Sequence, residues 1–375
     1  MYGWGDSMRT FALSVLVLGL CGTLLPGQGR QNKAGFVAVV ESRFGNWDTN
    51  RNGSLESAEI DHLLKSHSVR GDEAAAVASI HVWFRGNPSV QHVTLQTLKN
   101  MKDGTEERRD LSQKSPHLNS NYLAFSKHLR EVPRQVFARN PSVVGMSQGH
   151  LGDCFFVSTM GGFVHRNPAE IRKIIHQNPD GSFDVSFNPN HKVHVPALTD
   201  GLICLGSTAH DQGLWLNIME EGAGQAHHAK KGSTNTNEPA VDRLAKGGDM
   251  GEIMELLTGH AVERMHFKHV PHAKIHDAMT RAKGSGLLVG AATPNAGAHL
   301  PPGVPSGHAY AVLEVKGNNV TLWNPWGNHF KPKQMPYGKA NGYAVENGIF
   351  TMPFNDFAET YESVVIETHQ MAKRR

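Results

Sequence analysis

The twelve residues 48–59, DTNRNGSLESAE, constrain the local fold more than any other stretch of this chain. Oxygen-bearing residues occupy its positions 1, 3, 5, 7 and 12, which are Asp48, Asn50, Asn52, Ser54 and Glu59. Calcium takes six to eight oxygen ligands, and the glycine at position 6, Gly53, permits the sharp turn that gathers them. The loop therefore predicts a calcium site held between two helices, with these five residues as ligands.

Apolar residues flank the loop, in GFVAVVESRF before it and in the helix expected after it. This is the pattern of an EF-hand, and EF-hands usually occur in pairs. When Val93 is set at position 8 of a second loop, residues 77–101 offer no carboxylate ligand. We expect a small all-α EF-hand module over 34–100, whose non-binding second half places Val93 beside Leu55. A plain helical hairpin remains an alternative for that half.

The N-terminus has the pattern of a secretory signal peptide. Met8 and Arg9 precede the apolar stretch TFALSVLVLGLCGTLLPG, which ends in small residues. Residues 11–25 are short for a bilayer span, so an uncleaved membrane anchor is less favoured. We expect a signal peptide over 1–29, a secreted or periplasmic protein, and no stable membrane span after its removal.

Composition excludes some classes of function. The 37 basic and 34 acidic residues are interspersed, with a net charge of +3, so no nucleic-acid partner is expected. Two of the 3 cysteines, Cys154 and Cys204, follow the signal peptide, which excludes a disulfide framework. The 23 histidines lack metal-site spacing and are interpreted as structural or solvated. The oligomeric state is not set by the sequence.

Residues 101–130 are polar and weakly periodic, which predicts a linker, so we expect the EF-hand module to fold apart from the rest of the chain. Residues 131–370 are rich in glycine, with short β-type runs and a few helices. Within them, DGLICLGS predicts that Cys204 is a buried strand residue. The chain thus divides into a small N-terminal module and one larger domain.

A second cysteine lies in SQGHLGDCFF (147–156), where the adjoining apolar run predicts a buried helix starting near Cys154. A thiol at a helix N-terminus meets the positive end of the dipole, which favours thiolate. Taken alone, the stretch fits either a nucleophile or a core cysteine. The choice depends on partners elsewhere in the chain.

Two later stretches supply those partners. SGHAYAVLEV places His308 at the start of a strand, and VTLWNPWGNHF places Asn324 at the end of the next one. A turn at Gly317–Asn319 would set the two strands side by side, and with them the two side chains. A cysteine nucleophile needs an imidazole partner, which an asparagine can orient. With such a partner, we expect the pKa of the Cys154 thiol to fall well below its ordinary value.

The region 131–370 contains three motifs of interest: QGHLGDCFF (148–156), GHAYAV (307–312) and NPWG (324–327). Through these motifs it resembles the calpain family of papain-like cysteine proteases. The resemblance implies an α+β core with a helical lobe over 131–259 and a β-rich lobe over 260–370. It implies Cys154 as nucleophile, His308 as base, Asn324 as the residue that orients it, and Gln148 as oxyanion donor. Trp326 matches the family tryptophan near the cleft, whereas Phe155 replaces a tryptophan.

These features predict a secreted cysteine endopeptidase that acts on protein or peptide substrates and binds Ca²⁺ through its EF-hand. Two alternatives stay open. One is a catalytically silent calcium-binding scaffold or adhesion protein, and the other is an acyltransferase with the same triad. Regulation is not inferred from the family, because here the EF-hand precedes the protease core.

Overall fold

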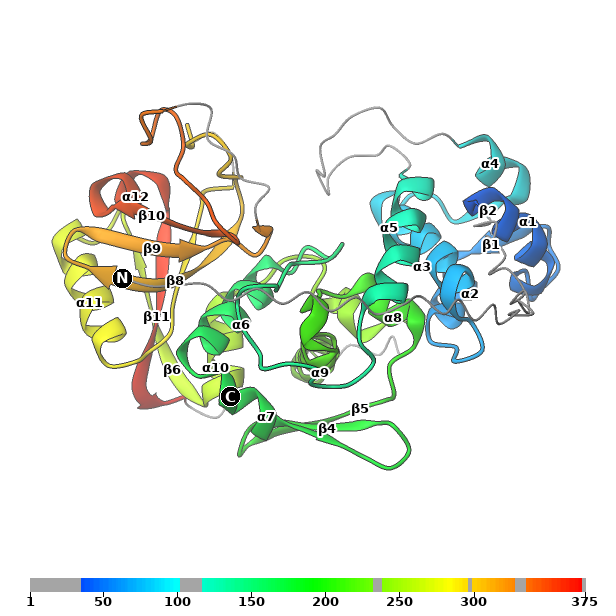
Figure 1. Ribbon diagram of the computed structural model, residues 1–375, viewed down its shortest axis with the longest axis horizontal. Helices are drawn as coiled ribbons and strands as arrows, with labels where there is room; N and C mark the ends of the chain where they lie inside the picture. The colour runs from blue at the N-terminus through cyan, green and yellow to red at the C-terminus, as the bar shows by residue number, and fades with distance from the viewer. Residues whose placement is uncertain (1–34, 102–116, 232–237, 296–298, 328–334, 373–375) are drawn as a thin grey trace, which may run out of the picture. The chain divides into compact units, whose positions relative to one another are not determined.

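The computed structural model describes residues 35–101, 117–231, 238–295, 299–327 and 335–372 (Figure 1). The expected signal peptide (1–29) and residues 102–116 of the expected linker lie outside these residues. Over the ranges described, no helix is both long and apolar enough to cross a membrane.

The N-terminal module consists of two helix–loop–helix units. Its elements are α1 (Phe36–Trp47), β1 (Ser54–Glu56), α2 (Ser57–Leu64), α3 (Gly71–Gly86), β2 (His92–Thr94) and α4 (Leu95–Asn100). β1 and β2 pair antiparallel, with Leu55 opposite Val93 as the sequence predicts. Both side chains are buried. The module is therefore not all-α as expected, because a two-stranded ribbon ties its two loops together.

Helix α5 (Leu118–Glu131) occupies most of the described part of the expected linker. Leu118, Tyr122, Phe125 and Leu129 recur at helical spacing and are buried. The interpretation of 118–130 as linker is thus corrected. Most of the polar residues of 118–130 lie on the outer face of this helix, and Ser126 is buried with the apolar ones.

The module packs against the domain that comes after it in the chain. Helix α3 lies against α5 and against α8 (Asp200–Leu205), and the Gly71 N–H donates to Asp200 Oδ2 at 2.8 Å. One hydrophobic cluster includes Phe36 and Ile80 of the module together with Phe156 of the larger domain. The expectation of an independently folded module is therefore corrected. Cys204, expected in a strand, is buried in α8 because the apolar run DGLICL forms a helix.

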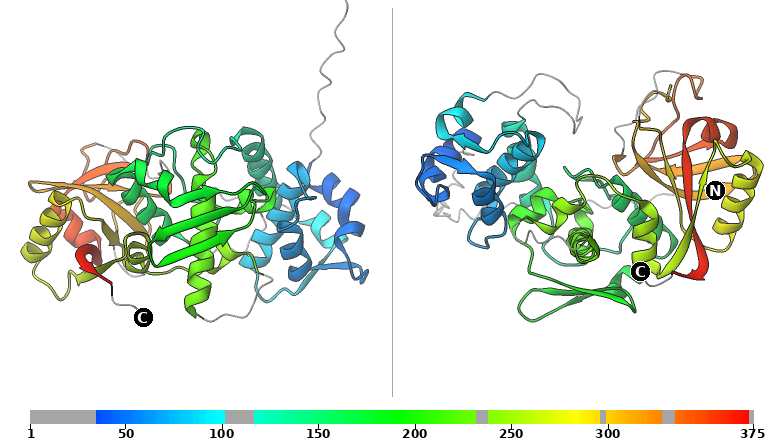
Figure 2. Two further views of the ribbon diagram at one scale, coloured as in Figure 1. Left: turned by 90° about the horizontal axis from the view of Figure 1, so that it is seen from below. Right: turned by 180° about the vertical axis from the view of Figure 1, so that it is seen from behind.

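The helical lobe also contains a small sheet. Besides α8, its elements are α6 (Cys154–Arg166), α7 (Pro168–Ile174), β3 (Ile175–Gln177), β4 (Phe183–Asn188), β5 (His191–Val195), η1 (His210–Gln212), α9 (Trp215–Lys231), η2 (Ala240–Arg243) and α10 (Met250–Thr258). The antiparallel sheet β3–β4–β5 packs against α9 and is seen face-on in the left view of Figure 2.

The β-rich lobe is built on a six-stranded antiparallel sheet of order β10-β9-β8-β7-β11-β6. Its elements are β6 (His260–His266), α11 (His272–Gly284), β7 (Val289–Ala292), β8 (Ala309–Lys316), β9 (Asn319–Trp323), β10 (Ile349–Pro353), α12 (Phe354–Thr360) and β11 (Ser363–Met371). Alternate residues of β8 point to opposite faces. Ala309 and Ala311 belong to one hydrophobic cluster, together with residues of α6 and α10. Tyr310 and Val312 belong to the other, together with residues of α11 and α12.

Candidate active site

Cys154 is the first residue of α6, as the sequence predicts, and α6 packs against β8. Gly161 permits this close packing, because a Cβ there would lie 2.4 Å from the Trp323 ring. Trp323 ends β9 and directly precedes Asn324. The glycine therefore lets the helix that carries Cys154 approach the strand ends that carry His308 and Asn324.

His308 and Asn324 lie side by side, as expected from a hairpin of β8 and β9. His308 Nε2 is 2.9 Å from Asn324 Oδ1, and both residues are almost fully buried, with 3 % and 1 % exposed. Asn324 Oδ1 also accepts the Trp326 N–H at 2.9 Å. An oxygen can only accept, so Nε2 must be the protonated nitrogen of a neutral His308 ring. This leaves Nδ1 as the nitrogen that can accept a proton.

The ring of Trp326 covers the imidazole of His308, with 4.2 Å between the ring centroids. Tyr310 meets the same imidazole edge-on at 5.0 Å. These contacts restrict the tilt of the ring and shield its hydrogen bond to Asn324 from water. Trp326 thus lies where the resemblance placed it, next to the histidine.

The electrostatics of the thiol differ from expectation. Burial raises the pKa of the Cys154 thiol to about 11, although the Ala309 N–H lowers it. Burial also lowers the pKa of His308 to about 4, against the opposing effect of the hydrogen bond to Asn324. Both residues belong to the described part of the chain, and no hydrogen bond joins the thiol to the ring. In this arrangement the neutral thiol and neutral imidazole are therefore favoured over an ion pair.

Gln148 lies in the segment that leads to the thiol, residues 147–153, called here the nucleophile segment. Its backbone N–H donates to the Pro325 carbonyl at 2.8 Å, so the segment is tied to the loop after Asn324. Its Nε2 donates to the Leu151 carbonyl at 2.6 Å. An amide nitrogen carries two protons, and this bond uses one of them.

A buried carboxyl pair next to Cys154 was missed by sequence reasoning. Asp153 and Glu220 of α9 are both 0 % exposed. Burial raises the pKa of both carboxyls, and the charge of Asp153 raises the pKa of Glu220 further. The Ser207 N–H and hydroxyl hold Glu220 at 2.7 and 2.8 Å, whereas no N–H or O–H of the described residues donates to the Asp153 carboxylate. A proton shared by the two carboxyls would give Asp153 a partner. The stretch LWLNIMEEGAG (214–224) contains Glu220, but nothing in it points to Asp153.

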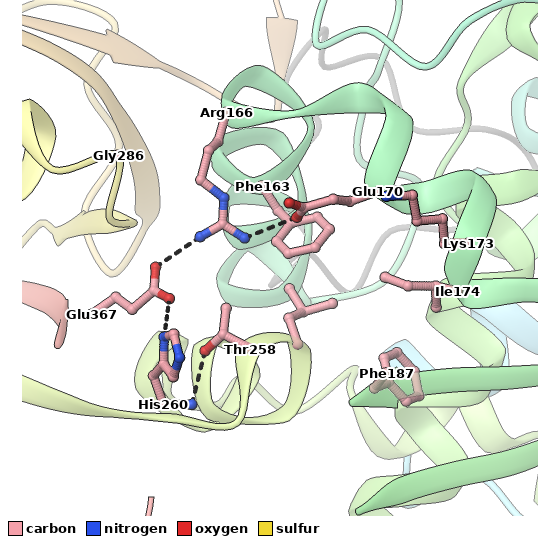
Figure 3. Close-up of a pocket in the computed structure, with 11 residues that line it drawn as sticks. Phe163, Arg166, Glu170, Lys173, Ile174, Phe187, Thr258, His260, Gly286 and Glu367 are labelled. Atoms are coloured by element: carbon pink, nitrogen blue, oxygen red, sulfur yellow. Dashed lines mark hydrogen bonds and ion pairs between the residues drawn. The ribbon is translucent and has the colours of Figure 1, made fainter. Parts of the chain in front are cut away.

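A hollow of about 450 Å³ lies at the other end of α6 from Cys154 (Figure 3). Glu367 is buried in its wall and is contacted by Arg166 at 3.0 Å and by His260 at 2.8 Å. The Leu288 N–H also donates to Glu367 at 2.8 Å. These contacts tie the last turn of α6 to the β-rich lobe. The 13 residues of α6, Cys154–Arg166, span about 18 Å, so this hollow is separate from the thiol.

The loop 48–59 is held by hydrogen bonds from its backbone N–H groups to its own carboxylates. Asp48 accepts N–H groups from Asn52 at 3.1 Å and Gly53 at 2.8 Å, and Gly53 takes a φ of +81°. Glu59 accepts the Thr49 N–H at 2.8 Å and lies 8 % exposed. These bonds keep Asp48 and Glu59 directed at the backbone of the same loop. A set made only of oxygen donors fits a hard cation such as calcium.

The helical lobe and the antiparallel-sheet lobe bring a cysteine, a histidine and an asparagine together, an arrangement that fits a cysteine protease. The family model described as calpain family cysteine protease matches residues 125–368, which is more than half of the chain. The chain therefore belongs to the calpain family of cysteine proteases. The match begins within α5, so helices α1–α4 lie outside it. A search of curated proteins found no match to this chain.

Proposed function

We propose that this chain is an exported cysteine endopeptidase that cleaves protein substrates through Cys154, His308, Asn324 and Gln148. The observation that carries the proposal is the buried 2.9 Å hydrogen bond from His308 to Asn324, next to the helix that begins at Cys154. A silent scaffold would have no need to hold a neutral imidazole in one tautomer beside a thiol. Residues 1–29 act as the export signal in this proposal.

The geometry supports a stepwise acyl transfer. The Cys154 sulfur attacks the carbonyl carbon of the peptide bond while its proton passes to Nδ1 of His308. The Cys154 N–H and the Gln148 amide stabilise the oxyanion, and the protonated ring then gives its proton to the leaving amine. Water hydrolyses the resulting thioester with His308 as base, which restores the thiol. Asn324 holds Nε2–H throughout.

The test is proteolysis by the full chain, followed by labelling with an epoxide-bearing peptide inhibitor. We expect new amino termini in an unfolded protein substrate, complete inhibition at one label per chain, and the label on Cys154. Cys204 is the internal control, because it is buried and should stay unmodified. Hydrolysis that survives full labelling of Cys154 would refute the proposal. Preferential transfer of the acyl group to an added amine would instead favour the acyltransferase.

We also propose that residues 48–59 bind Ca²⁺ as an EF-hand loop. Asp48, Asn50 and Asn52 would contribute side-chain oxygens, Ser54 its carbonyl, and Glu59 both carboxylate oxygens. The oxygen-only donor set and the ribbon that ties this loop to its partner support the proposal. Bound calcium would supply the positive charge that these buried carboxylates otherwise lack.

Glu59→Gln is expected to weaken calcium binding on the order of a hundredfold, because it removes one full charge and replaces one ligand oxygen with an amide. Titration calorimetry of the full chain with calcium measures the change. Glu56→Gln is the matched control: Glu56 is position 9, which often binds through water, and its Oε1 accepts a hydrogen bond from Asn52. Equal affinities for both variants would argue against this ligand set.

A further inference from the structure

A charged cluster is buried where the N-terminal module meets the helical lobe. Nδ1 of His81 on α3 is 3.0 Å from Asp61 on α2, and its Nε2 is 2.7 Å from Asp242 in η2. Burial alone would lower the pKa of His81, but attraction and hydrogen bonding to the two carboxylates raise it to about 9. The two carboxylates therefore favour the protonated form of the ring. Each ring nitrogen lies at ion-pair distance from one of them.

Arg85 lies four residues after His81 on α3 and so shares its face of the helix. Its Nη1 donates to Asp242 Oδ1 at 3.1 Å. Burial alone would raise the pKa of Asp242, yet His81 and Arg85 hold it below its ordinary value. The two cations of α3 thus fix one carboxylate of the helical lobe. That carboxylate in turn fixes the guanidinium of Arg85.

The other arm of this guanidinium reaches the candidate active site. Arg85 Nη2 donates to the backbone carbonyl of His150, which lies within the nucleophile segment between Gln148 and Cys154. Phe125 of α5 packs edge-on against the His150 ring at 4.8 Å between centroids. Two helices that precede this segment in the chain, α3 and α5, therefore hold its middle.

The nucleophile segment is closely packed along its length. The Gly149 N–H donates to Ser207 Oγ at 3.3 Å, and a Cβ on Gly149 would lie 2.3 Å from the Gly206 carbonyl oxygen. A Cβ on Gly152 would lie 2.4 Å from the Ala245 carbonyl oxygen. Such packing transmits a displacement of the His150 carbonyl to the residues on either side. Those residues include Gln148 and Cys154.

We propose that Arg85 is a positioning residue for catalysis: its guanidinium holds the His150 carbonyl and thereby fixes the Gln148 amide and the Cys154 N–H for the oxyanion. The inference rests on the proposed function of that site. A planar guanidinium can bind a carboxylate and a carbonyl with separate N–H groups, whereas an ammonium on a lysine stem cannot match this fork. The N-terminal module in this way completes the site that the family domain carries.

The test compares Arg85→Ala with Arg134→Ala in the full chain. Arg134 pairs with Asp200 at 2.9 Å where the same module and lobe meet, but the structure gives it no contact with the nucleophile segment. We expect Arg85→Ala to lower kcat about a hundredfold with little change in KM, because misplacing catalytic groups by about 1 Å costs about that much. Arg134→Ala should keep kcat within about twofold of the wild type. Melting temperatures of both variants monitor folding.

Added guanidinium distinguishes positioning from general destabilisation. Arg85 is 25 % exposed, so millimolar guanidinium chloride can enter the space left in Arg85→Ala. Added guanidinium should raise the kcat of Arg85→Ala at least tenfold, and it should not raise the activity of Cys154→Ala. If Arg85→Ala fails to fold, Arg85→Lys keeps the charge beside Asp242 and should still lose kcat. Full kcat in a folded Arg85→Ala or Arg85→Lys variant, or a loss that tracks the unfolded fraction without rescue, would overturn the inference.

The proposed function is judged separately in the same experiment. Hydrolysis by the wild type that disappears in Cys154→Ala supports the function even if Arg85 proves dispensable. The double variant Arg85→Ala/Gln148→Ala adds a coupling measurement. It should lose less than the product of the two single losses, because Arg85 acts in part through Gln148 and in part through the Cys154 N–H. Strictly multiplicative losses would show that Arg85 does not act through Gln148.

Discussion

Cys154→Ala and His308→Ala are each expected to lower kcat/KM on the order of 10⁴-fold to 10⁶-fold, with unfolding midpoints close to that of the wild type. The sulfur forms the acyl bond and the imidazole moves the proton, so the reaction cannot proceed by the same route without either one. Because the two residues act as one unit, the double variant should be no slower than either single variant. Hydrolysis of a fluorogenic peptide by the purified full chains measures all three.

The matched control for the thiol is Cys204→Ala, which removes the other free cysteine of the described residues from α8. It should leave kcat/KM nearly unchanged, although loss of a buried sulfur lowers stability by roughly 1 kcal/mol. Asn324→Ala should retain more activity than His308→Ala, since it loosens the ring without removing it. Mild and equal losses at Cys154, His308 and Cys204 would mean that these residues serve the fold alone.

The resting thiol is expected to react with iodoacetamide about a thousandfold more slowly at pH 6 than at pH 9. The reason is a thiol pKa of about 11, because the thiolate fraction falls tenfold for each pH unit below the pKa. A thiolate–imidazolium pair would instead give an alkylation rate that does not change with pH until the pH falls to the low pKa of the thiol. Burial of both groups is the physical reason to expect the steep profile. Mass spectrometry of the Cys154 peptide at several pH values gives the rates.

His308→Ala is the diagnostic variant for this profile. If the resting ring carries no proton from the thiol, its removal should leave the slope of rate against pH unchanged. A small-molecule thiol measured in parallel corrects for the reagent. A plateau between pH 5 and pH 8 in the wild type that is lost in His308→Ala would establish the ion pair and overturn the expectation of a neutral pair.

Much of the candidate site could be predicted from the sequence because its parts are carried by short local patterns. The apolar run after Cys154 predicts α6. The alternation of apolar and polar residues on both sides of Gly317 predicts the hairpin that sets His308 beside Asn324. The pairing of Leu55 with Val93 is expected from aligning two loops at position 8. In each case the interaction that fixes the geometry lies within a few residues, or comes from pairing two neighbouring strands.

The missed features depend on contacts between distant segments. Arg85 meets His150 across 65 residues of chain, and Asp153 faces Glu220 of another helix, so neither pair leaves a local pattern. The pKa expected for Cys154 differs in direction from the one that burial favours, for a related reason. A helix N-terminus and a histidine partner favour thiolate, but the degree of burial that opposes it depends on how the two lobes close over the site.

One hydrophobic cluster runs from Phe36 of α1 through Phe156 of α6 to Trp323 of β9, so these regions should melt as a single cooperative unit. Any compound that binds only the folded state at one end of this unit then raises the melting temperature of the other end as well. A fragment cut at residue 131 would leave the apolar surface of α8 exposed where α3 covers it now. Such a fragment should aggregate rather than serve as a minimal protease.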